Sequence, residues 1–367
     1  MAKRAYIGIG GTAEKIRKGY VGIDSAARKL KKAYIGIGGV ARPCWAGGEI
    51  VYYGEITPLS TARRGCGTAV VSGFMLVAGG ANAFTAGAAN YDTVDAYDKT
   101  LTRTAVTSLS AAGWAIAGAS INGEKAFLGG RYRAGSFLSN VDVYDDALTR
   151  SNTSLSQGKY NVRGTNVGCY ALLAGGSVNS TYYYNVDAFD MDLTKTTPLS
   201  LLADCYSGGG NIAGVYALYP ASSTGSSAYD ADLTRVTAPI LSHASGSYAV
   251  GSLARSGLVF GQYNTTMDVF DENLTRTTIS PRSVASIPGV TALEDHVLAA
   301  GGYIASSGSW SDMVESFDSD LVRKVITSLP KQMSSNTPGT VGDFAIFPGG
   351  EPAGSGVTNS AYAYTFD

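Results

Sequence analysis

Short apolar runs recur along most of the chain, and most of them end in glycine or in a turn signal. In residues 59–107, a small apolar run at 67–72 and an unbroken apolar run at 74–78 predict two strands that are buried on both faces. Residues 93–97 alternate between apolar and polar positions, which predicts a half-exposed third strand. Residues 102–107 are polar and β-branched, as is typical of a strand at a sheet edge. The unit is therefore predicted to consist of four short strands.

A phrase made of an aromatic residue, Asp, a short gap and Leu-Thr-Arg, or a close relative of it, occurs six times, and a seventh copy is truncated to Tyr-Thr-Phe-Asp at residue 367; the intervals are 40 to 49 residues. The aspartates of the seven copies are Asp98, Asp145, Asp190, Asp230, Asp271, Asp318 and Asp367. A period of this size indicates a propeller or an array, because one such unit cannot bury its apolar face alone. The identical position of the aspartates predicts a turn, in which the carboxylate accepts the backbone N–H two residues on. General acid–base catalysis would need carboxylates in unequal environments.

A Gly-Gly pair follows the second predicted strand in most units. The pair occurs at 79–80, 129–130, 175–176, 301–302 and 349–350, and it degenerates to Tyr219-Pro220 and Phe260-Gly261 in the two short units. Together with the aromatic strand that leads into a turn, this pattern resembles the kelch family of β-propellers over roughly residues 49–367. Leu-Thr-Arg stands where kelch repeats usually carry a tryptophan. The resemblance implies an all-β fold, a seven-bladed kelch-like β-propeller.

The last unit ends at Asp367, before its outer strand is made. Residues 49–60 supply a candidate for that strand, because they end in Thr-Pro-Leu-Ser, which occurs again at 197–200. We expect this N-terminal strand to complete the seventh blade, join the two ends of the ring and remove its open edges. An open solenoid would need a polar capping repeat, which the sequence does not show. The chain thus divides into a segment 1–48 and a propeller 49–367.

Residues 1–48 carry a different repeat, in which Tyr6, Tyr20 and Tyr34 stand fourteen residues apart. In each unit an alternating run precedes a Gly-rich or Asp-Ser turn and a basic return segment, which predicts a β-hairpin. One turn of helix is the alternative for the basic segment. Units this small bury little apolar surface and are not expected to be stable alone.

Charge divides between the same two segments. Residues 1–42 hold ten Lys or Arg against two acids, about +8, so the remainder carries about −9 to give the total of −1. Such asymmetry suggests a binding partner. The regular Gly and Ile positions favour docking onto another protein over a solvated tail, and both over nucleic acid or a membrane. The candidate docking residues are Tyr6, Lys15, Tyr20, Lys29, Tyr34 and Arg42.

The three units, AYIGIGGTAEKIRK, GYVGIDSAARKLKK and AYIGIGGVARPCW, are similar to tandem repeats of virion proteins from phages and prophages of Gram-positive bacteria. The resemblance covers about 45 residues. It implies a component of a phage or phage-tail-like particle, present in multiple copies, whose segment 1–48 docks to other virion proteins. No signal-peptide core follows Lys3-Arg4, so we expect synthesis in the host cytoplasm and a location in the virion.

Composition argues against several other functions. No apolar run approaches the length of a membrane span. The four cysteines lie far apart in unlike contexts, so buried free thiols are expected. The two histidines, His243 and His296, lack metal-ligand spacing, and we expect neither a metal nor a cofactor. Neither the histidine pair of copper-radical oxidases nor the Asp-box repeats and arginine triad of sialidases is visible, so no enzymatic activity is expected.

In a four-stranded blade, the loops between the second and third strands and the loops between blades emerge on one face, and the Gly-Gly loops vary most in length here. Their Tyr, Ser, Gly and Asn content suits recognition, and aromatic faces beside Asn and Arg suit a sugar. The candidate ligand-binding residues are Arg131, Tyr132, Arg133, Tyr182, Tyr183, Tyr184, Tyr263, Tyr303 and Trp310. The blade-entry residues expected to flank them are Arg63, Arg64, Lys159, Tyr160, Arg163 and Arg282. Packing between blades is the alternative role for each tyrosine.

These features predict a non-enzymatic display protein. Segment 1–48 would anchor the chain to the tail, baseplate or head surface of a particle. The propeller loops would bind a host-surface glycan, as a receptor-binding and host-attachment protein does, or a neighbouring virion protein. The alternative is an intracellular kelch-type adaptor for a peptide, and a carbohydrate-active propeller enzyme is a more distant one.

Overall fold

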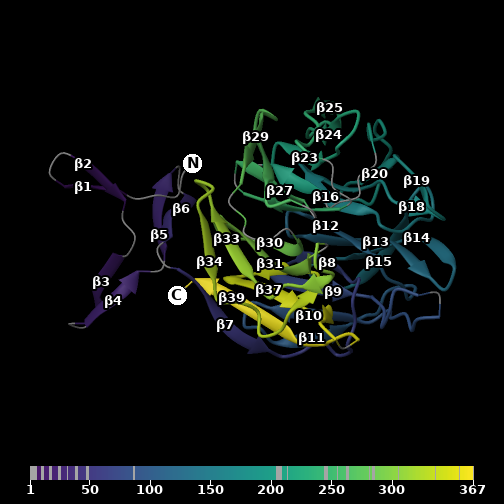
Figure 1. Cartoon of the computed structure of the whole chain (residues 1–367), viewed down its shortest axis with the longest axis horizontal. Helices are drawn as coiled ribbons and strands as arrows, with labels where there is room; N and C mark the ends of the chain where they lie inside the picture. Colours follow the sequence, from purple (N-terminus) through teal and green to yellow (C-terminus); the bar gives the residue numbers. More distant parts are fainter. Residues whose placement is uncertain are drawn as a thin grey trace.

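The computed structural model describes residues 49–366 apart from 86, 204–208, 213, 244–246, 254, 262–263, 281, 283–285, 305, 335 and 355, together with the backbone of six short strands within residues 6–46. This described part consists of strands, turns and loops, and no helix in it could span a membrane. Segments of the ring that are far apart in the sequence lie side by side in Figure 1, as β7 (Ile50–Ile56) and β39 (Ala361–Phe366) do.

Seven sheets form the ring. Each has four main strands, which follow one another from the central axis to the outside of the ring. The first three blades are β8 (Gly67–Val71), β9 (Phe74–Ala78), β10 (Val94–Asp98) and β11 (Arg103–Val106); β12 (Ala117–Ile121), β13 (Lys125–Arg133), β14 (Ser136–Tyr144) and β15 (Arg150–Ser154); and β16 (Arg163–Val167), β17 (Tyr170–Ala174), β20 (Val186–Phe189) and β21 (Lys195–Thr196). The next three are β22 (Gly210–Ile212), β23 (Tyr216–Tyr219), β24 (Ser226–Tyr229) and β25 (Arg235–Ala238); β26 (Tyr248–Ser252), β27 (Ser256–Gly261), β28 (Met267–Asp271) and β29 (Arg276–Ile279); and β30 (Ile287–Leu293), β31 (His296–Ile304), β33 (Val314–Asp318) and β34 (Arg323–Ile326). Short pairs lie in the loops: β18 (Ser177–Val178) with β19 (Thr181–Tyr182), β32 (Ser309–Trp310) with β31, and β35 (Met333–Ser334) with β38 (Glu351–Pro352). The predicted seven-bladed β-propeller is confirmed.

The two ends of the propeller close the ring in the seventh blade. Its strands are β36 (Gly339–Val341), β37 (Phe344–Pro348), β39 (Ala361–Phe366) and the N-terminal β7 (Ile50–Ile56). β7 pairs antiparallel with β39, with Ile56 opposite Ala361 and Ile50 opposite Phe366. The predicted closure is therefore confirmed. It removes the open sheet edge that the last blade would otherwise expose.

The core lies between blades rather than inside them. The described buried apolar side chains fall into seven clusters, and each joins two neighbouring blades. One cluster unites Ile56 and Ile346 of the seventh blade with Met75 and Tyr97 of the first. Each blade therefore buries both of its faces against neighbours, which is why a single repeat cannot fold by itself.

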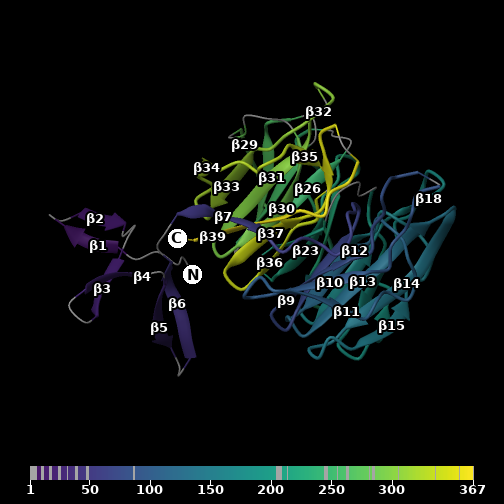
Figure 2. The same ribbon diagram turned by 90° about the horizontal axis from the view of Figure 1, so that it is seen from below.

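The connections divide between two faces of the ring. The first-to-second and third-to-fourth strand connections lie on one face, which we call the turn face. The second-to-third and the blade-to-blade connections lie on the opposite face, which we call the loop face. Because Ile50 pairs with Phe366, where β39 ends, β7 begins at the turn face. The segment 1–48 therefore joins the propeller at the turn face, and its strands lie outside the ring of blades (Figures 1 and 2).

The third-to-fourth strand turns have the predicted aspartate geometry. Asp98 Oδ1 accepts the backbone N–H of Thr100 at 2.8 Å and that of Thr102 at 3.0 Å. The Thr100 hydroxyl, which also donates to this carboxylate, is the main cause of a lowered Asp98 pKa. The same pair of backbone bonds recurs at Asp145, Asp190, Asp230, Asp271 and Asp318.

The seventh predicted aspartate does not occupy this position. Thr365 pairs with Phe344 as Asp98 pairs with Phe74, so Thr365 is the structural equivalent of Asp98. Asp367 lies outside the described residues. The seventh blade needs no such turn, because its outer strand comes from the other end of the propeller.

Three antiparallel hairpins make up the described backbone of residues 6–46. They are β1 (Tyr6–Ile9) with β2 (Thr12–Lys15), β3 (Gly19–Ile23) with β4 (Ala26–Leu30), and β5 (Lys32–Ile37) with β6 (Val40–Ala46). The basic return segments are thus strands, and the hairpin prediction is confirmed. The roles predicted for the side chains of Tyr6, Lys15, Tyr20, Lys29, Tyr34 and Arg42 concern side chains outside the described ones.

Candidate functional site: the loop face

Blade-entry residues and Gly-Gly loops meet on the loop face, as predicted. Arg64 forms an antiparallel bridge with Ala81, Trp114 forms one with Tyr132, and Tyr160 forms one with Ser177. The Gly-Gly pair allows this close approach: Gly80 has a φ of +106°, and a Cβ there would lie 2.8 Å from the Arg64 carbonyl oxygen. Each bridge fixes one entry side chain beside the loop that follows the second strand.

Several of the predicted surface cations lie beneath this face instead of on it. Arg63 and Arg131 are fully buried and pair with the equally buried Asp95 and Asp142, each at 2.8 Å. Arg282 pairs with Glu315 at 3.1 Å in the same way, and burial lowers its pKa. Arg131 is therefore not a ligand-binding residue, and Arg63 and Arg282 do not flank a ligand surface.

Lys159 plays the corresponding part in the third blade. Its side chain is fully buried, and its ammonium donates to the Asn185 side-chain oxygen at 2.9 Å. Burial lowers the Lys159 pKa to about 8, against the opposing attraction of Asp187. Lys159 also departs from the prediction, because it supports the loops from below.

These ion pairs correct the predicted exposure of the third strands. β10 is buried over its first four residues, including Asp95, where alternation predicted a half-exposed strand. A carboxylate can be buried there because a cation from the loop above it neutralises its charge. The alternation was real, but both faces of the strand are covered by neighbouring blades.

Five aromatic rings from three successive blades gather at one sector of the loop face. We call this group the loop-face aromatic cluster, and its members are Phe84, Trp114, Tyr132, Phe137 and Tyr160. Phe84 stacks on Trp114 with ring centroids 4.6 Å apart, and Tyr132 lies between 5.3 and 5.8 Å from Trp114, Phe137 and Tyr160. Phe84 is 39% exposed, and the other four rings are half-buried.

A cation lies over the Phe84 ring of the stack. The Arg64 guanidinium lies 3.9 Å from the centroid of the Phe84 ring and forms an ion pair with Glu351 from the seventh blade. Burial lowers the Arg64 pKa. The order Arg64, Phe84, Trp114 thus forms a continuous stack across the junction of the first two blades.

The predicted ligand-binding residues that are described at the surface, other than Tyr132, lie outside the aromatic cluster. Tyr182 and Tyr184 are each 41% exposed in the third blade, with Tyr183 half-buried between them. Arg133 is exposed at the end of β13. Tyr303 and Trp310 contact each other edge to face at 6.0 Å in the sixth blade. Tyr263 lies outside the described residues. Of the nine predicted residues, only Tyr132 belongs to the aromatic cluster.

Trp114 was not among the predicted site residues. Its signal in the sequence is positional: like Arg64 and Tyr160, it stands four residues before the second residue of an innermost strand, which is Thr68, Gly118 or Gly164. Aligning the blades on those residues would have placed the three side chains together.

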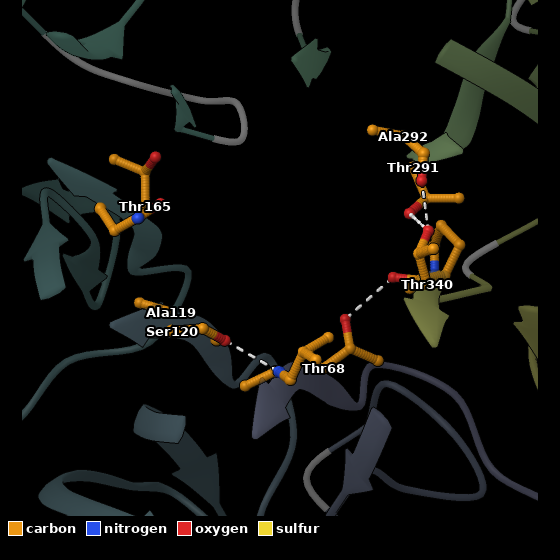
Figure 3. Close-up of a pocket in the computed structure, with 13 residues that line it drawn as sticks. Thr68, Ala119, Ser120, Thr165, Thr291, Ala292 and Thr340 are labelled. Carbon is orange, nitrogen blue, oxygen red and sulfur yellow. Dashed lines mark hydrogen bonds between the residues drawn. The ribbon is translucent and has the colours of Figure 1, made fainter. Parts of the chain in front are cut away.

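A cavity of about 300 Å³ occupies the central channel, between the innermost strands β8, β12, β16, β30 and β36. Figure 3 shows Thr68, Thr165, Thr291 and Thr340 around this space. The Thr291 and Thr340 hydroxyls lie 3.0 Å apart, and Thr68 Oγ1 donates to the Pro338 carbonyl at 3.1 Å. Every described lining residue is uncharged, and the described residues contain no metal-binding group of three side chains. The channel therefore offers no evident acid, base or metal chemistry.

The described cysteines differ in exposure. Cys66 is a buried free thiol whose pKa burial raises, whereas Cys169 is free but exposed. The expectation of a buried thiol is thus confirmed for Cys66 and wrong for Cys169, which follows the tight turn at Gly168 on the turn face.

Comparison with known proteins supports the architecture. No protein-family model matches the chain, and neither does any curated protein. A solved structure described as the structure of YjhT aligns with a TM-score of 0.54 at 11% sequence identity, covering 83% of this chain and 95% of that one. At this identity the similarity concerns the fold alone. The chain is thus a seven-bladed β-propeller preceded by hairpins.

Proposed function

We propose that this protein is a non-enzymatic display component of a phage or phage-tail-like particle. In this proposal segment 1–48 docks to another particle protein, and the loop face of the propeller binds a glycan of the host surface. The protein is carried in multiple copies as part of the virion.

The observation that carries the proposal is that the segment proposed for attachment and the loops proposed for binding are on opposite faces of the propeller. β7 begins at the turn face, so segment 1–48 leads away from that face, whereas the variable loops and their aromatic side chains lie on the other. An anchor on one face leaves the opposite face free to meet a ligand. The charge of about +8 in residues 1–42 gives the anchor an electrostatic preference for an acidic partner.

Deletion of residues 1–48 tests the anchor. The deletion leaves β7 and the closed ring intact, so the shortened chain is expected to fold and to fail to join particles. The measurement is the amount of the protein in purified particles, with circular dichroism to confirm β structure. Normal incorporation of the shortened chain would contradict the proposal and favour a soluble adaptor.

A charge-reversal pair sharpens the same test. Changing Lys15 and Lys29 to Glu in the full chain should reduce incorporation, because it replaces attraction by repulsion. Changing Lys99 and Lys331, two exposed lysines of the propeller, to Glu serves as the matched control and should leave incorporation unchanged. An equal loss of incorporation in both variants would show that incorporation depends on the net charge of the protein and not on the charge of segment 1–48.

A further inference from the structure

The polar atoms of the loop-face aromatic cluster are unsatisfied by the protein. Among the described residues, no hydrogen-bond partner is found for the hydroxyls of Tyr132 and Tyr160, and the buried indole nitrogen of Trp114 also has none. Tyr and Trp normally place their polar atoms on a partner when they are buried. The cluster therefore keeps hydrogen-bonding capacity that the fold does not use.

Other aromatic residues of this propeller show what satisfied packing looks like. The hydroxyl of Tyr97 donates to the Thr57 carbonyl at 2.8 Å, and that of Tyr144 donates to the Thr107 carbonyl at 2.7 Å. In the sixth blade, Trp310 Nε1 donates to Ser334 Oγ at 2.7 Å. The hydroxyls of Tyr132 and Tyr160 make no such bond among the described contacts, and they are not among the buried polar atoms that lack a partner, so they are open to solvent and within reach of a ligand.

Unsatisfied atoms continue along the edge of the cluster. Arg64 Nε and Asn90 Oδ1 are buried and have no partner among the described residues. Both belong to the bridged segments around Ala81, since Ala81 pairs with Arg64 on one side and Asn90 on the other. The accessible polar atoms of the cluster are the Tyr132 and Tyr160 hydroxyls. An aromatic surface with accessible hydroxyls beside it suits a pyranose ring, because the C–H face of the sugar stacks on a π-face while its hydroxyls bond the neighbouring polar atoms.

The two cations near the cluster narrow the ligand class. Arg133 is exposed but directly follows Tyr132 in β13, and successive side chains of a strand point to opposite faces of the sheet, so it points away from the Tyr132 ring. The charge of Arg64 is already paired with Glu351 and covered by Phe84, so it is not free to bind an anion. From this combination we infer that the loop-face aromatic cluster is the binding site for an uncharged pyranose-containing glycan.

This inference deepens the proposed function by naming the subsite and the ligand class. A shallow aromatic platform gives each copy a weak affinity. Display of several copies on one particle multiplies that affinity through effective concentration without new contacts.

Binding of the full chain to neutral oligosaccharides of four or more hexose or N-acetylhexosamine units tests the inference. Trp114 lies in the site, so its fluorescence emission should shift on titration, and the shift should vanish in Trp114→Phe. Trp310→Phe is the matched control and should keep the shift.

A second variant removes the two tyrosine hydroxyls of the cluster and keeps the aromatic rings. Tyr132→Phe combined with Tyr160→Phe should weaken binding about tenfold, which corresponds to two lost hydrogen bonds of modest strength. Tyr97→Phe removes a hydroxyl that serves the fold and should leave affinity unchanged. Tyr53→Ala removes an exposed ring outside the site, on the outer strand β7, and should also leave it unchanged.

Three results would overturn the inference: binding of no neutral oligosaccharide at millimolar concentration, binding that the double tyrosine variant leaves intact, or binding restricted to acidic glycans or peptides. None of them bears on the anchor. Particle incorporation that depends on residues 1–48 would still support the proposed attachment, so the two proposals can fail separately.

Discussion

Asp95 links the closing strand to the first blade. Its carboxylate is fully buried and accepts hydrogen bonds from the Ser60 backbone N–H at 3.0 Å, the Ser60 hydroxyl at 3.0 Å, Arg63 at 2.8 Å and Arg103 at 2.7 Å. Ser60 follows β7, so this carboxylate ties the segment after the closing strand to the third strand of the next blade. We predict that Asp95→Leu destabilises the propeller severely.

The magnitude follows from what the substitution leaves behind. Arg63 has no exposure, so loss of Asp95 leaves a buried guanidinium without its counter-ion. Removal of one partner of a buried ion pair costs about 3–5 kcal/mol. Arg103 is 24% exposed, so water can solvate its charge once Asp95 is lost, and it adds little to the free-energy cost of the substitution. The expected loss is therefore about 4 kcal/mol.

The assay is urea-induced unfolding followed by circular dichroism, applied to Asp95→Leu, Arg63→Met and the double variant. The double variant should be less destabilised than the sum of the two single variants by about 2 kcal/mol or more, because it leaves no buried charge. Asp268→Leu is the matched control. Its cation, Arg276, is 28% exposed at 3.6 Å, so a smaller loss is expected. A loss below about 1 kcal/mol for Asp95→Leu, or additivity in the cycle, would refute this account of the ion pair.

The remaining predictions concern Lys159, the thiols and the turns. Because burial lowers the Lys159 pKa to about 8, the folded state loses this proton at lower pH than the unfolded state, and stability should rise by about 2 kcal/mol between pH 7.5 and 9.5 relative to Lys159→Met; a flat difference in unfolding free energy would contradict it. Iodoacetamide should modify Cys169 in the native protein and spare Cys66, as peptide mass spectrometry would show, and equal labelling would contradict their described exposures. Asp145→Ala removes two backbone-to-carboxylate bonds at the surface and should cost about 1 kcal/mol in urea unfolding, far less than loss of Asp95; a cost as large as that at Asp95 would mean that the turns carry more than local structure.

The repeat allowed much of the fold to be predicted. The second strand was placed at 74–78, and β9 is Phe74–Ala78; the first and third differ from prediction by a single residue at one end or at each end. Closure by residues 49–60 was predictable because a unit at one terminus lacked a strand that the other terminus supplied. The last aspartate was misplaced because a terminal unit lacks the turn that fixes the alignment of the others.

The candidate site was predicted only in part. Placing the variable loops on one face required only strand order, and the bridges confirm that blade-entry residues meet them there. Whether a given cation lies on the surface depends on a partner between 11 and 33 residues away, as Arg131 with Asp142 and Arg282 with Glu315 show. Alternation along β10 gave no sign of such a partner, so Arg63, Arg131, Lys159 and Arg282 were expected at the surface and are buried.

The sequence by itself determined the period, the strands, the closing strand and the hairpins of residues 6–46, because these depend on local alternation and turn chemistry repeated along the chain. Only the tertiary structure decided which charges are buried in pairs and which rings share a surface. The reason is that Phe84, Trp114 and Tyr160 come from different blades, and their contact depends on how neighbouring blades pack.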